Sequence, residues 1–217
     1  MAIIDISNNI SYKEIDRTHG IKEVITTMNG WGVDIKNSKT LDMFAGDGSW
    51  CSNILLPLVS KNSVCWDINS DKLKVLNQNY GLKTVNSDVL TSIKNNQENF
   101  DIIHCDNPSS VYGENTKRYE YFDVIPYIKD LFSKECIFIH NLNTTPYNFN
   151  PDSNWAKKRS EFYNLQDTSD LNPNEILSYH INYFKDQGIK VSKSSYIARE
   201  MYNGNVYWWY LVYKLNK

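Results

Sequence analysis

LDMFAGDGSW, residues 41–50, decides the fold class of this 217-residue chain. An apolar run with one acidic residue, Asp42, leads into a turn that holds Gly46 and Gly48, and a helical pattern begins at Trp50. Glycine lets the backbone turn tightly and approach a ligand with no Cβ in the way, and a helix start presents free N–H groups. The stretch therefore predicts a strand, a tight turn and a helix, with a nucleotide-like ligand at the turn.

The ligand expected at this turn carries positive charge. The turn does not follow the G-x-G-x-x-G pattern, since residue 51 is Cys, and Asp47 stands where a pyrophosphate would be repelled. These features disfavour NAD and ATP. A nicotinamide-dependent oxidoreductase is the weakest alternative, because it needs a turn that tolerates phosphate.

After this motif, short apolar runs alternate with amphipathic stretches, which is typical of repeated βα units and a mostly parallel sheet. The predicted strands are Thr40–Phe44, Ser63–Asp67, Lys83–Val85, Phe100–Cys105 and Glu135–His140. The predicted helices are Ser11–Met28, Trp50–Leu58, Ser70–Tyr80 with Ser70 as its N-cap, Val89–Lys94, Tyr119–Phe132, Trp155–Leu165 and Asn174–Lys185. We expect one α/β domain over residues 1–217, with a helical extension at 1–36 and an insertion or lid-like segment at 141–173.

The end of the chain predicts an antiparallel hairpin. Two β-rich stretches, Lys190–Arg199 and Val206–Leu215, flank Tyr202-Asn203-Gly204-Asn205, and Asn-Gly is a strong hairpin signal. The aromatic run Val206–Tyr213 is expected to pack in the core, because strand residues alternate between faces and the inward half must fill the layer.

Composition excludes several classes of protein. Hydrophobic residues make up 41% of the chain and aromatic residues 13%, which excludes wholesale disorder. A net charge of −2 gives no overall basic field for phosphate backbones. The four cysteines and four histidines show no metal-ligand spacing, so we expect buried free thiols and no metal site. No apolar run approaches the ~20 residues of a membrane span, and no leader begins the chain, so we expect a cytoplasmic protein without membrane contact.

Acidic residues also end the next two predicted strands. Asp67 follows the glycine turn by about 20 residues, from where a carboxylate can accept both hydroxyls of a ribose. Asp88 follows the third strand, beside the apolar Val89, where an acceptor can read an adenine edge. A single strand-end Asp is usually a cap or a turn residue, but three in successive βα units favour one ligand crevice.

These residues resemble the motifs of class I S-adenosylmethionine-dependent methyltransferases. LDMFAGDG is similar to their first motif, Asp67 to their ribose-binding acid, and Asp88-Val89 to their adenine-contacting pair. The resemblance covers roughly residues 37–217. It implies a Rossmann-like three-layer sandwich, with a seven-stranded, mostly parallel sheet of order 3-2-1-4-5-7-6, and S-adenosylmethionine as cofactor. The cofactor-binding residues it implies are Asp42, Phe44, Ala45, Gly46, Asp47, Gly48, Asp67, Ile68, Asp88, Val89 and Asp106.

A second motif, Asp106-Asn107-Pro108-Ser109, follows the fourth predicted strand. It is similar to the Asp/Asn-Pro-Pro-aromatic motif of methyltransferases that act on exocyclic amino groups of nucleic acid bases. The resemblance implies that the Asp106 side chain and the Asn107 carbonyl accept the amino hydrogens, with Pro108 as the third catalytic-motif residue. The predicted substrate-binding residues are Ser109, Tyr112, Lys117 and Arg118.

This second motif departs from the family pattern, and the departure leaves alternatives open. Asn107 replaces the first proline, and Ser109 replaces the aromatic residue that stacks on the base, with Tyr112 as the nearest substitute. The leading prediction is methylation of an amino group of a nucleic acid base, in DNA or RNA. A small-molecule or protein acceptor is the first alternative, and a catalytically weak, cofactor-binding partner subunit is the second. Asp-Asn-Pro-Ser is also ordinary turn chemistry.

The segment 141–173 combines aromatic and basic residues. Its aromatic residues include Tyr147, Phe149, Trp155 and Tyr163, and Lys157, Lys158 and Arg159 form a basic cluster. This combination suits a flat, negatively charged acceptor such as a nucleotide or a single strand. The alternative is a loop folded on its own aromatic side chains, with the basic cluster as a solvated helix face.

Overall fold

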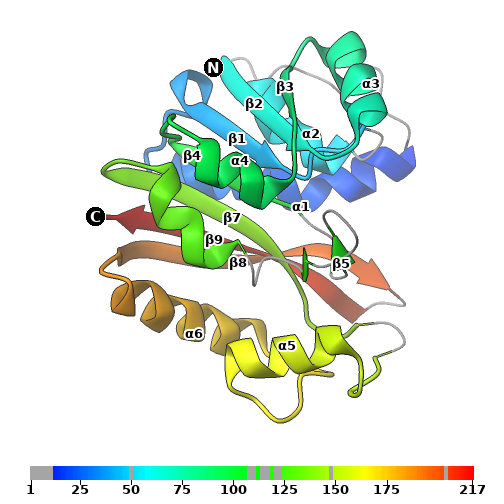
Figure 1. Ribbon diagram of the computed structural model, residues 1–217, viewed down its shortest axis with the longest axis vertical. Helices are drawn as coiled ribbons and strands as arrows, with labels where there is room; N and C mark the ends of the chain where they lie inside the picture. Colours follow the sequence, from blue (N-terminus) through cyan, green and yellow to red (C-terminus); the bar gives the residue numbers. More distant parts are fainter. Residues whose placement is uncertain are drawn as a thin grey trace.

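Seven strands form one sheet in the order β3-β2-β1-β4-β7-β9-β8, shown in Figure 1. The structure is a computed structural model that describes residues 12–48, 51–106, 111–112, 118–119, 124–146, 149–202 and 205–217. The strands of the sheet are β1 (Lys39–Met43), β2 (Asn62–Asp67), β3 (Lys83–Asn86), β4 (Ile102–Cys105), β7 (Glu135–Asn143), β8 (Lys190–Tyr202) and β9 (Asn205–Asn216). Two short strands, β5 (Val111–Tyr112) and β6 (Arg118–Tyr119), form a separate antiparallel pair.

The pairing of the strands confirms the predicted topology. The first five strands of the sheet pair in parallel, and β9 pairs antiparallel with both β7 and β8. Numbered within this sheet alone, the order is 3-2-1-4-5-7-6. The predicted hairpin is present, since Tyr202 pairs with Asn205, while its central residues 203 and 204 lie outside the described residues.

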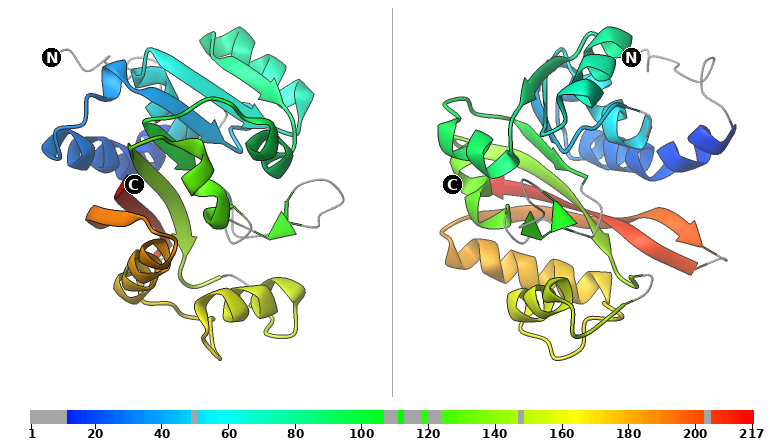
Figure 2. Two further views of the ribbon diagram at one scale, coloured as in Figure 1. Left: turned by 60° about the vertical axis from the view of Figure 1, so that its left-hand side comes forward. Right: turned by 45° about the vertical axis from the view of Figure 1, so that its right-hand side comes forward.

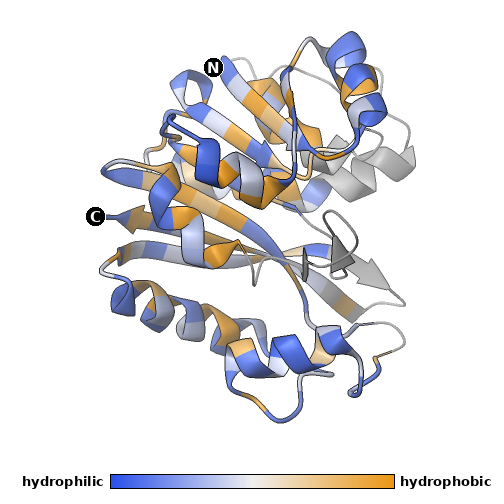
Figure 3. Cartoon of the chain, in the orientation of Figure 1, coloured by the Kyte–Doolittle hydropathy of each residue, from blue (hydrophilic) through white to orange (hydrophobic). Residues whose placement is uncertain are grey.

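Helices cover both faces of the sheet and make a three-layer sandwich. On one face, α1 (Tyr12–Gly30) and α2 (Cys51–Val59) pack on strand residues such as Ile139 and Val212, and α3 (Ser70–Tyr80) continues that layer. On the other face lie α4 (Val89–Asn95), the 3-10 helix η5 (Ile125–Leu131), α5 (Asn154–Tyr163) and α6 (Pro173–Asp186). A further 3-10 turn, η2 (Ile35–Asn37), precedes β1. The views in Figure 2 show α1 and α6 on opposite sides of the strands, and Figure 3 shows apolar residues along the strands and polar residues on the outer side of α6.

One predicted helix cap and one predicted strand end are wrong for identifiable reasons, although α3 has the predicted bounds. Asn69, not Ser70, caps α3, because the Asn69 side chain accepts from the backbone N–H groups of Asp71 and Lys72. The strand predicted at Glu135–His140 continues to Asn143, because β9 keeps pairing with it as far as the Asn143–Trp208 pair.

The helix predicted at Tyr119–Phe132 is wrong at its first residue and in its type. Tyr119 belongs to β6, and the helical part that the structure describes, Ile125–Leu131, consists of 3-10 turns, while residues 120–123 lie outside the described residues. Pro126 stands in the first turn of η5, where proline starts a helix but cannot continue one from the preceding residues. No helix among the described residues is long and apolar enough to cross a membrane.

Candidate functional site

The turn that follows β1 has an unusual backbone. Phe44, Gly46 and Gly48 have φ angles of 63°, 63° and 76°, which is the left-handed region. For Phe44 this conformation is strained, and such strain is concentrated at functional turns. A Cβ on Gly48 would lie 2.7 Å from the ring of Tyr80, whereas a Cβ on Gly46 would meet no atom of the described residues within 4 Å. Gly48 therefore permits close packing beneath the turn, and the described residues leave the space beside Gly46 open.

Asp67, at the end of β2, fixes this turn to the sheet. Its Oδ2 accepts from the backbone N–H of Gly46 at 2.9 Å, and its Oδ1 accepts from that of Asn69 at 2.8 Å. A carboxylate has about four acceptor positions, so the half-buried Asp67 retains capacity for further donors. Ile68 is 48% exposed beside it. The structure thus brings the glycine turn, an acceptor carboxylate and an apolar surface together, as the sequence predicted.

Asp42 lies beneath the turn rather than at its surface. It is fully buried on β1, opposite His104 on β4, with Oδ1 3.0 Å from His104 Nδ1. The contact is short enough for an ion pair but is too poorly aligned to count as a hydrogen bond. The pKa of Asp42 is raised to about 6, chiefly by burial and to a smaller extent by the charges of Asp106 and Asp67, while the contact with His104 acts in the opposite direction.

His104 responds to the same buried charges. Burial by itself lowers its pKa, but the contact with Asp42 and the charge of Asp106 outweigh burial and raise it. Asp67 and Asp106 are thus both close enough to Asp42, at one end of the sheet, to raise its pKa.

Asp88 and Val89 have structural roles at the start of α4. Asp88 caps α4, with Oδ1 accepting from the backbone N–H groups of Leu90 and Thr91. Val89 is 3% exposed and packs in the core. Asp88 still lies at the carboxyl end of β3, next to β2, so its place in the cofactor site stays a prediction.

Asp106, which follows β4, is held by two side chains that the sequence did not reveal. Arg199 Nη2 lies 3.1 Å from Oδ1 and 3.2 Å from Oδ2 of Asp106, and the hydroxyl of Tyr210 donates to Oδ2 at 3.1 Å. Arg199 Nε in turn donates to the Tyr210 hydroxyl at 3.1 Å. Asp106 is 2% exposed, and the Arg199 guanidinium also stacks over the ring of Trp208.

Neither Arg199 on β8 nor Tyr210 on β9 belongs to a recognisable sequence motif. Arg199 lies at a bulge in β8, and Tyr210 belongs to an aromatic run that is mostly core. The predicted core role of this run is confirmed for Tyr210 and Tyr213, which are fully buried, whereas Trp208 and Trp209 are half-buried. Arg199 and Tyr210 reach Asp106 because β9 pairs with β7 on one side and with β8 on the other.

Asn141 is a further polar group that the sequence did not single out. It pairs with Tyr210 across β7 and β9, and it is 1% exposed. Neither atom of its carboxamide has a hydrogen-bond partner in the described part of the chain. A buried, unsatisfied amide is rare in folded proteins.

Several predicted site residues lie outside what the structure describes. Residues 107–110 and 113–117, which include Asn107, Pro108, Ser109 and Lys117, fall there. For Tyr112 and Arg118 only the backbone is described, in the β5–β6 pair. Of the second motif, only Asp106 is therefore placed.

Three of the cysteines and three of the histidines lie in the interior, whereas His19 is exposed. Cys65, Cys105 and Cys136 are free and buried, as expected, and burial raises the pKa of Cys65. His140 Nε2 lies 3.3 Å from His180 Nδ1, which is 2.8 Å from the Tyr213 hydroxyl. Among the described residues, no group of three or more His, Cys, Asp or Glu side chains is arranged to hold a metal ion.

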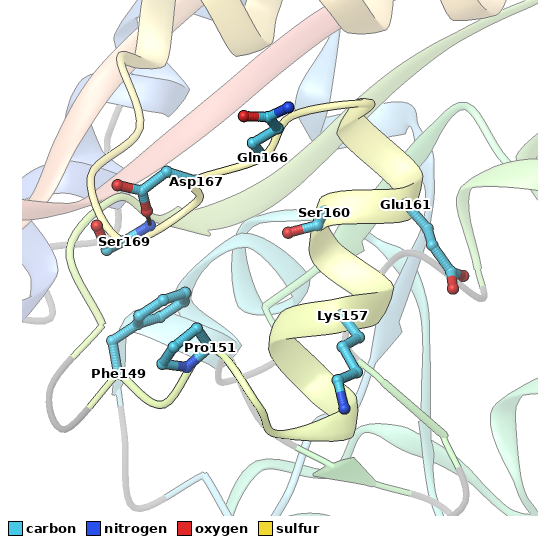
Figure 4. Close-up of a pocket in the computed structure, with 8 residues that line it drawn as sticks. All are labelled: Phe149, Pro151, Lys157, Ser160, Glu161, Gln166, Asp167 and Ser169. Carbon is cyan, nitrogen blue, oxygen red and sulfur yellow. Dashed lines mark hydrogen bonds between the residues drawn. The ribbon is translucent and has the colours of Figure 1, made fainter.

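The segment that follows β7 holds a pocket of about 640 Å³, shown in Figure 4. Its walls come from α5 and the flanking loops: Phe149, Pro151, Lys157, Ser160, Glu161, Gln166, Asp167 and Ser169. None of these residues belongs to the carboxyl edge of β1, β2 or β4, so this pocket is separate from the glycine turn.

The basic cluster predicted on this segment divides into two groups. Lys157 is exposed and Lys158 lies 3.9 Å from Glu161, but Arg159 is fully buried. Describing all three as one solvated face is therefore wrong for Arg159. The helical spacing explains this, because Ala156, Arg159 and Tyr163 share the inward stripe of α5.

Comparisons with known proteins agree with this fold. No protein-family model and no curated protein matches the chain. Among solved structures, magnesium protoporphyrin IX methyltransferase from Synechocystis with bound S-adenosylmethionine matches with a TM-score of 0.54 and 11% identity, over 94% of this chain and 80% of that chain.

Two other solved structures match to a similar degree. An N-methyltransferase from Bradyrhizobium japonicum matches with a TM-score of 0.54 and 9% identity, over 91% of this chain and 97% of that chain. A ribosomal protein L11 methylase from Lactobacillus delbrueckii matches with a TM-score of 0.50 and 11% identity, over 89% and 77%. The strand order, the terminal hairpin and these likenesses together show that the chain has the fold of class I S-adenosylmethionine-dependent methyltransferases.

Proposed function

We propose that this protein is an S-adenosylmethionine-dependent methyltransferase that methylates an amino group of a nucleic acid base. The observation that carries the proposal is the position of Asp106. It follows β4, next to the strand that ends in the strained glycine turn, and its charge acts on Asp42 beneath that turn. Ligands of open α/β sheets bind at this carboxyl edge.

The residues at the turn fit the proposed cofactor. The space beside Gly46 is open, and Asp67 offers acceptors for two ribose hydroxyls while it holds the turn in place. The half-buried carboxylate of Asp67 beside the turn makes the surroundings favourable for a cation. When bound, S-adenosylmethionine would supply a methyl group on a positively charged sulfur atom.

Asp106 is proposed to orient the acceptor amine. Its oxygens accept from Arg199 and Tyr210, so the direction of the carboxylate is fixed before substrate arrives. Correct alignment of two reacting groups supplies a large part of a rate enhancement. Because Arg199 already neutralises the charge of Asp106, we assign this carboxylate to hydrogen bonding with the amine rather than to uptake of its proton.

The test uses Asp106→Ala and labelled S-adenosylmethionine. The acceptors are single-stranded DNA and RNA oligonucleotides in which adenine or cytosine is the only base with a candidate amino group. Transfer by the wild-type protein, with at least a tenfold slower rate for Asp106→Ala, is expected, since removing one positioned hydrogen-bonding group typically costs about 10²-fold. Asp130→Ala, a change at an exposed residue of η5, is the control and should keep the wild-type rate. A wild-type rate in Asp106→Ala would exclude the assigned role.

A non-base acceptor is the second candidate, favoured by Ser109 in place of the stacking aromatic residue. Loss of base stacking removes about 1–3 kcal/mol of binding per base. Labelled methyl transfer to small molecules or proteins of a host extract, without transfer to the oligonucleotides, would support this candidate. The remaining alternative, a cofactor-binding partner subunit, predicts cofactor binding by the purified chain but no transfer to any acceptor.

A further inference from the structure

Arg159 on α5 is a fully buried arginine with few hydrogen-bond acceptors. Its Nη2 donates to the backbone carbonyl of Asn143, and its guanidinium lies 5.1 Å from the ring of Trp155. Nε and Nη1 have no hydrogen-bond partner among the described residues. These two atoms carry three of the five N–H donors of a guanidinium. Burying a charged group with unsatisfied donors is energetically costly.

The carboxylates of the same segment do not compensate this charge. Glu161 lies 3.9 Å from Lys158, Asp170 accepts from the Thr145 hydroxyl, and Asp167 accepts from the backbone N–H of Ser169. No ion pair within the described part of the chain includes Arg159. A second buried group of this segment, the Thr168 hydroxyl, also has no described partner.

The position of Arg159 relates it to the proposed acceptor site. Its partner Asn143 ends β7, which runs parallel to β4, and His140 of β7 pairs with Cys105 of β4. Asn143 is therefore two residues, about 7 Å, farther along the sheet than Asp106 and one strand, about 5 Å, to the side. The backbone of Asn143, to which Arg159 is bonded, is thus on the order of 10 Å from the backbone of Asp106.

We propose that Arg159 is an anion-binding subsite, which holds a compact oxyanion of the acceptor, either phosphate or carboxylate. Guanidinium groups pair strongly with such oxyanions, because the planar set of donors matches their oxygens. The pocket in Figure 4 is not this subsite, since Glu161 and Asp167 line it and would repel an anion. Assigning the oxyanion to the acceptor rests on the proposed function, whereas anion binding at Arg159 does not. Because Arg159 has no exposed surface, binding of the anion is followed to equilibrium.

The test titrates the purified protein with inorganic phosphate and, separately, with acetate, each followed to equilibrium. The readouts are the thermal midpoint and the arginine Nε–H resonances, with the Arg159 signal assigned by its absence in Arg159→Lys. We expect a saturable shift of that signal and a rise in the thermal midpoint with one of the two ions. Arg159→Met, which keeps apolar bulk, should lose the response, and Arg159→Lys should keep part of it. Lys157→Met, on the exposed side of the same helix, is the matched control and should respond like the wild-type protein.

The outcomes separate this proposal from the proposed function. No saturable response to either ion, or equal responses in wild-type and Arg159→Met protein, overturns the anion subsite even if the protein transfers methyl groups. A response without methyl transfer to any acceptor supports the subsite and counts against the proposed function. Where transfer occurs, Arg159→Met should raise the KM of a phosphate-bearing or carboxylate-bearing acceptor about tenfold and leave the KM of S-adenosylmethionine unchanged. An unchanged KM of the acceptor would show that the acceptor does not use the anion subsite at Arg159.

Discussion

At the scale of residues, three carboxylates at one edge of the sheet have different partners, and the partners decide what each can do. Asp67 accepts from backbone N–H groups of the glycine turn, Asp42 faces a buried histidine, and Asp106 is paired with Arg199. Only Asp67 combines partial exposure with spare acceptor capacity beside the open space at Gly46. It is therefore the best candidate for direct contact with the cofactor.

Asp67→Ala should weaken the affinity for S-adenosylmethionine. Each lost hydrogen bond to the charged acceptor is worth about 1.5–3 kcal/mol, or roughly a 10- to 100-fold loss of affinity. Calorimetric titration with the cofactor measures the effect. Asp71→Ala, which removes an exposed carboxylate of α3 that pairs with Lys74, is the matched control. Equal affinities of wild-type and Asp67→Ala protein would remove Asp67 from the site.

Arg199→Gln should slow methyl transfer without loosening the cofactor. The change leaves the buried Asp106 without its charged partner, so its carboxylate no longer has a fixed direction. We expect kcat to fall about tenfold or more, since misplacement of an aligning group by about 1 Å costs up to 10²-fold. Arg199→Lys should restore part of the rate, and Lys193→Gln, at an exposed residue of β8, should change nothing. An unaltered kcat in a folded Arg199→Gln protein would show that Asp106 needs no such support.

At the scale of elements, α1 lies unusually close to β8 beside this same cluster. A Cβ on Gly20 of α1 would lie 2.6 Å from the carbonyl oxygen of Ala198 and 2.9 Å from the Cα of Arg199. Only glycine allows this approach, because the opposing atoms belong to the backbone. The helix therefore depends on one residue for its position over Arg199 and Tyr210.

Gly20→Ala should destabilise the protein although alanine is the better helix former. Alanine gains about 1 kcal/mol in a helix interior, but the clash pushes α1 from β8, and overpacking typically costs about 1–3 kcal/mol. Gly30→Ala, at the end of the same helix, is the control because its Cβ would meet no atom of the described chain within 4 Å. Chemical denaturation should show lower stability for Gly20→Ala and no loss for Gly30→Ala. Equal stabilities would mean that α1 can shift without cost.

At the scale of the whole molecule, buried ionisable groups on the two faces of the sheet make stability depend on pH in opposite directions. Burial lowers the pKa of His140 to about 3 and that of His180 well below its usual value. In acid, these two histidines bind protons in the unfolded chain but stay neutral in the folded chain. They therefore reduce the free energy of unfolding as pH falls from about 6.5. Asp42, with its pKa raised to about 6, acts in the opposite direction, since the folded chain keeps a proton that the unfolded chain has released.

The combined effect of His140 and His180 is larger than the opposite effect of Asp42, so the free energy of unfolding should fall on acidification between pH 6 and pH 4. One net proton corresponds to about 1.4 kcal/mol per pH unit. Replacing His140 by Phe, which keeps a ring against Phe138 and Tyr213, should remove most of this slope. Urea denaturation at several pH values measures it, with His19→Gln, at an exposed residue of α1, as control. The same slope in wild-type protein and the His140 variant would show that these histidines are not the source.

The resemblance to class I methyltransferases implied the strand order. The sequence by itself predicted the α/β fold class, the terminal hairpin and a tight turn at Gly46 and Gly48. Those features depend on local signals: apolar runs of strand length, helix patterns, and glycines at positions that need left-handed backbone. LDMFAGDG and Asp67 are about 20 residues apart, and a single βα unit brings them together. The N-cap at Asn69 was missed because Ser70, the next residue, can make the same kind of capping hydrogen bond. The 3-10 turns at Ile125–Leu131 were missed because their start depends on Pro126.

Only the tertiary structure decided the surroundings of Asp106 and Arg159. Arg199 and Tyr210 are 93 and 104 residues away from Asp106, and they reach it because β9 inserts between β7 and β8. The sequence shows Lys157, Lys158 and Arg159 as one basic run, but the packing of α5 buries only Arg159 of the three. Hydrophobic patterns and turn residues depend on residues that are close together in the sequence. The partner of a buried charge depends instead on which distant strands lie side by side in the fold.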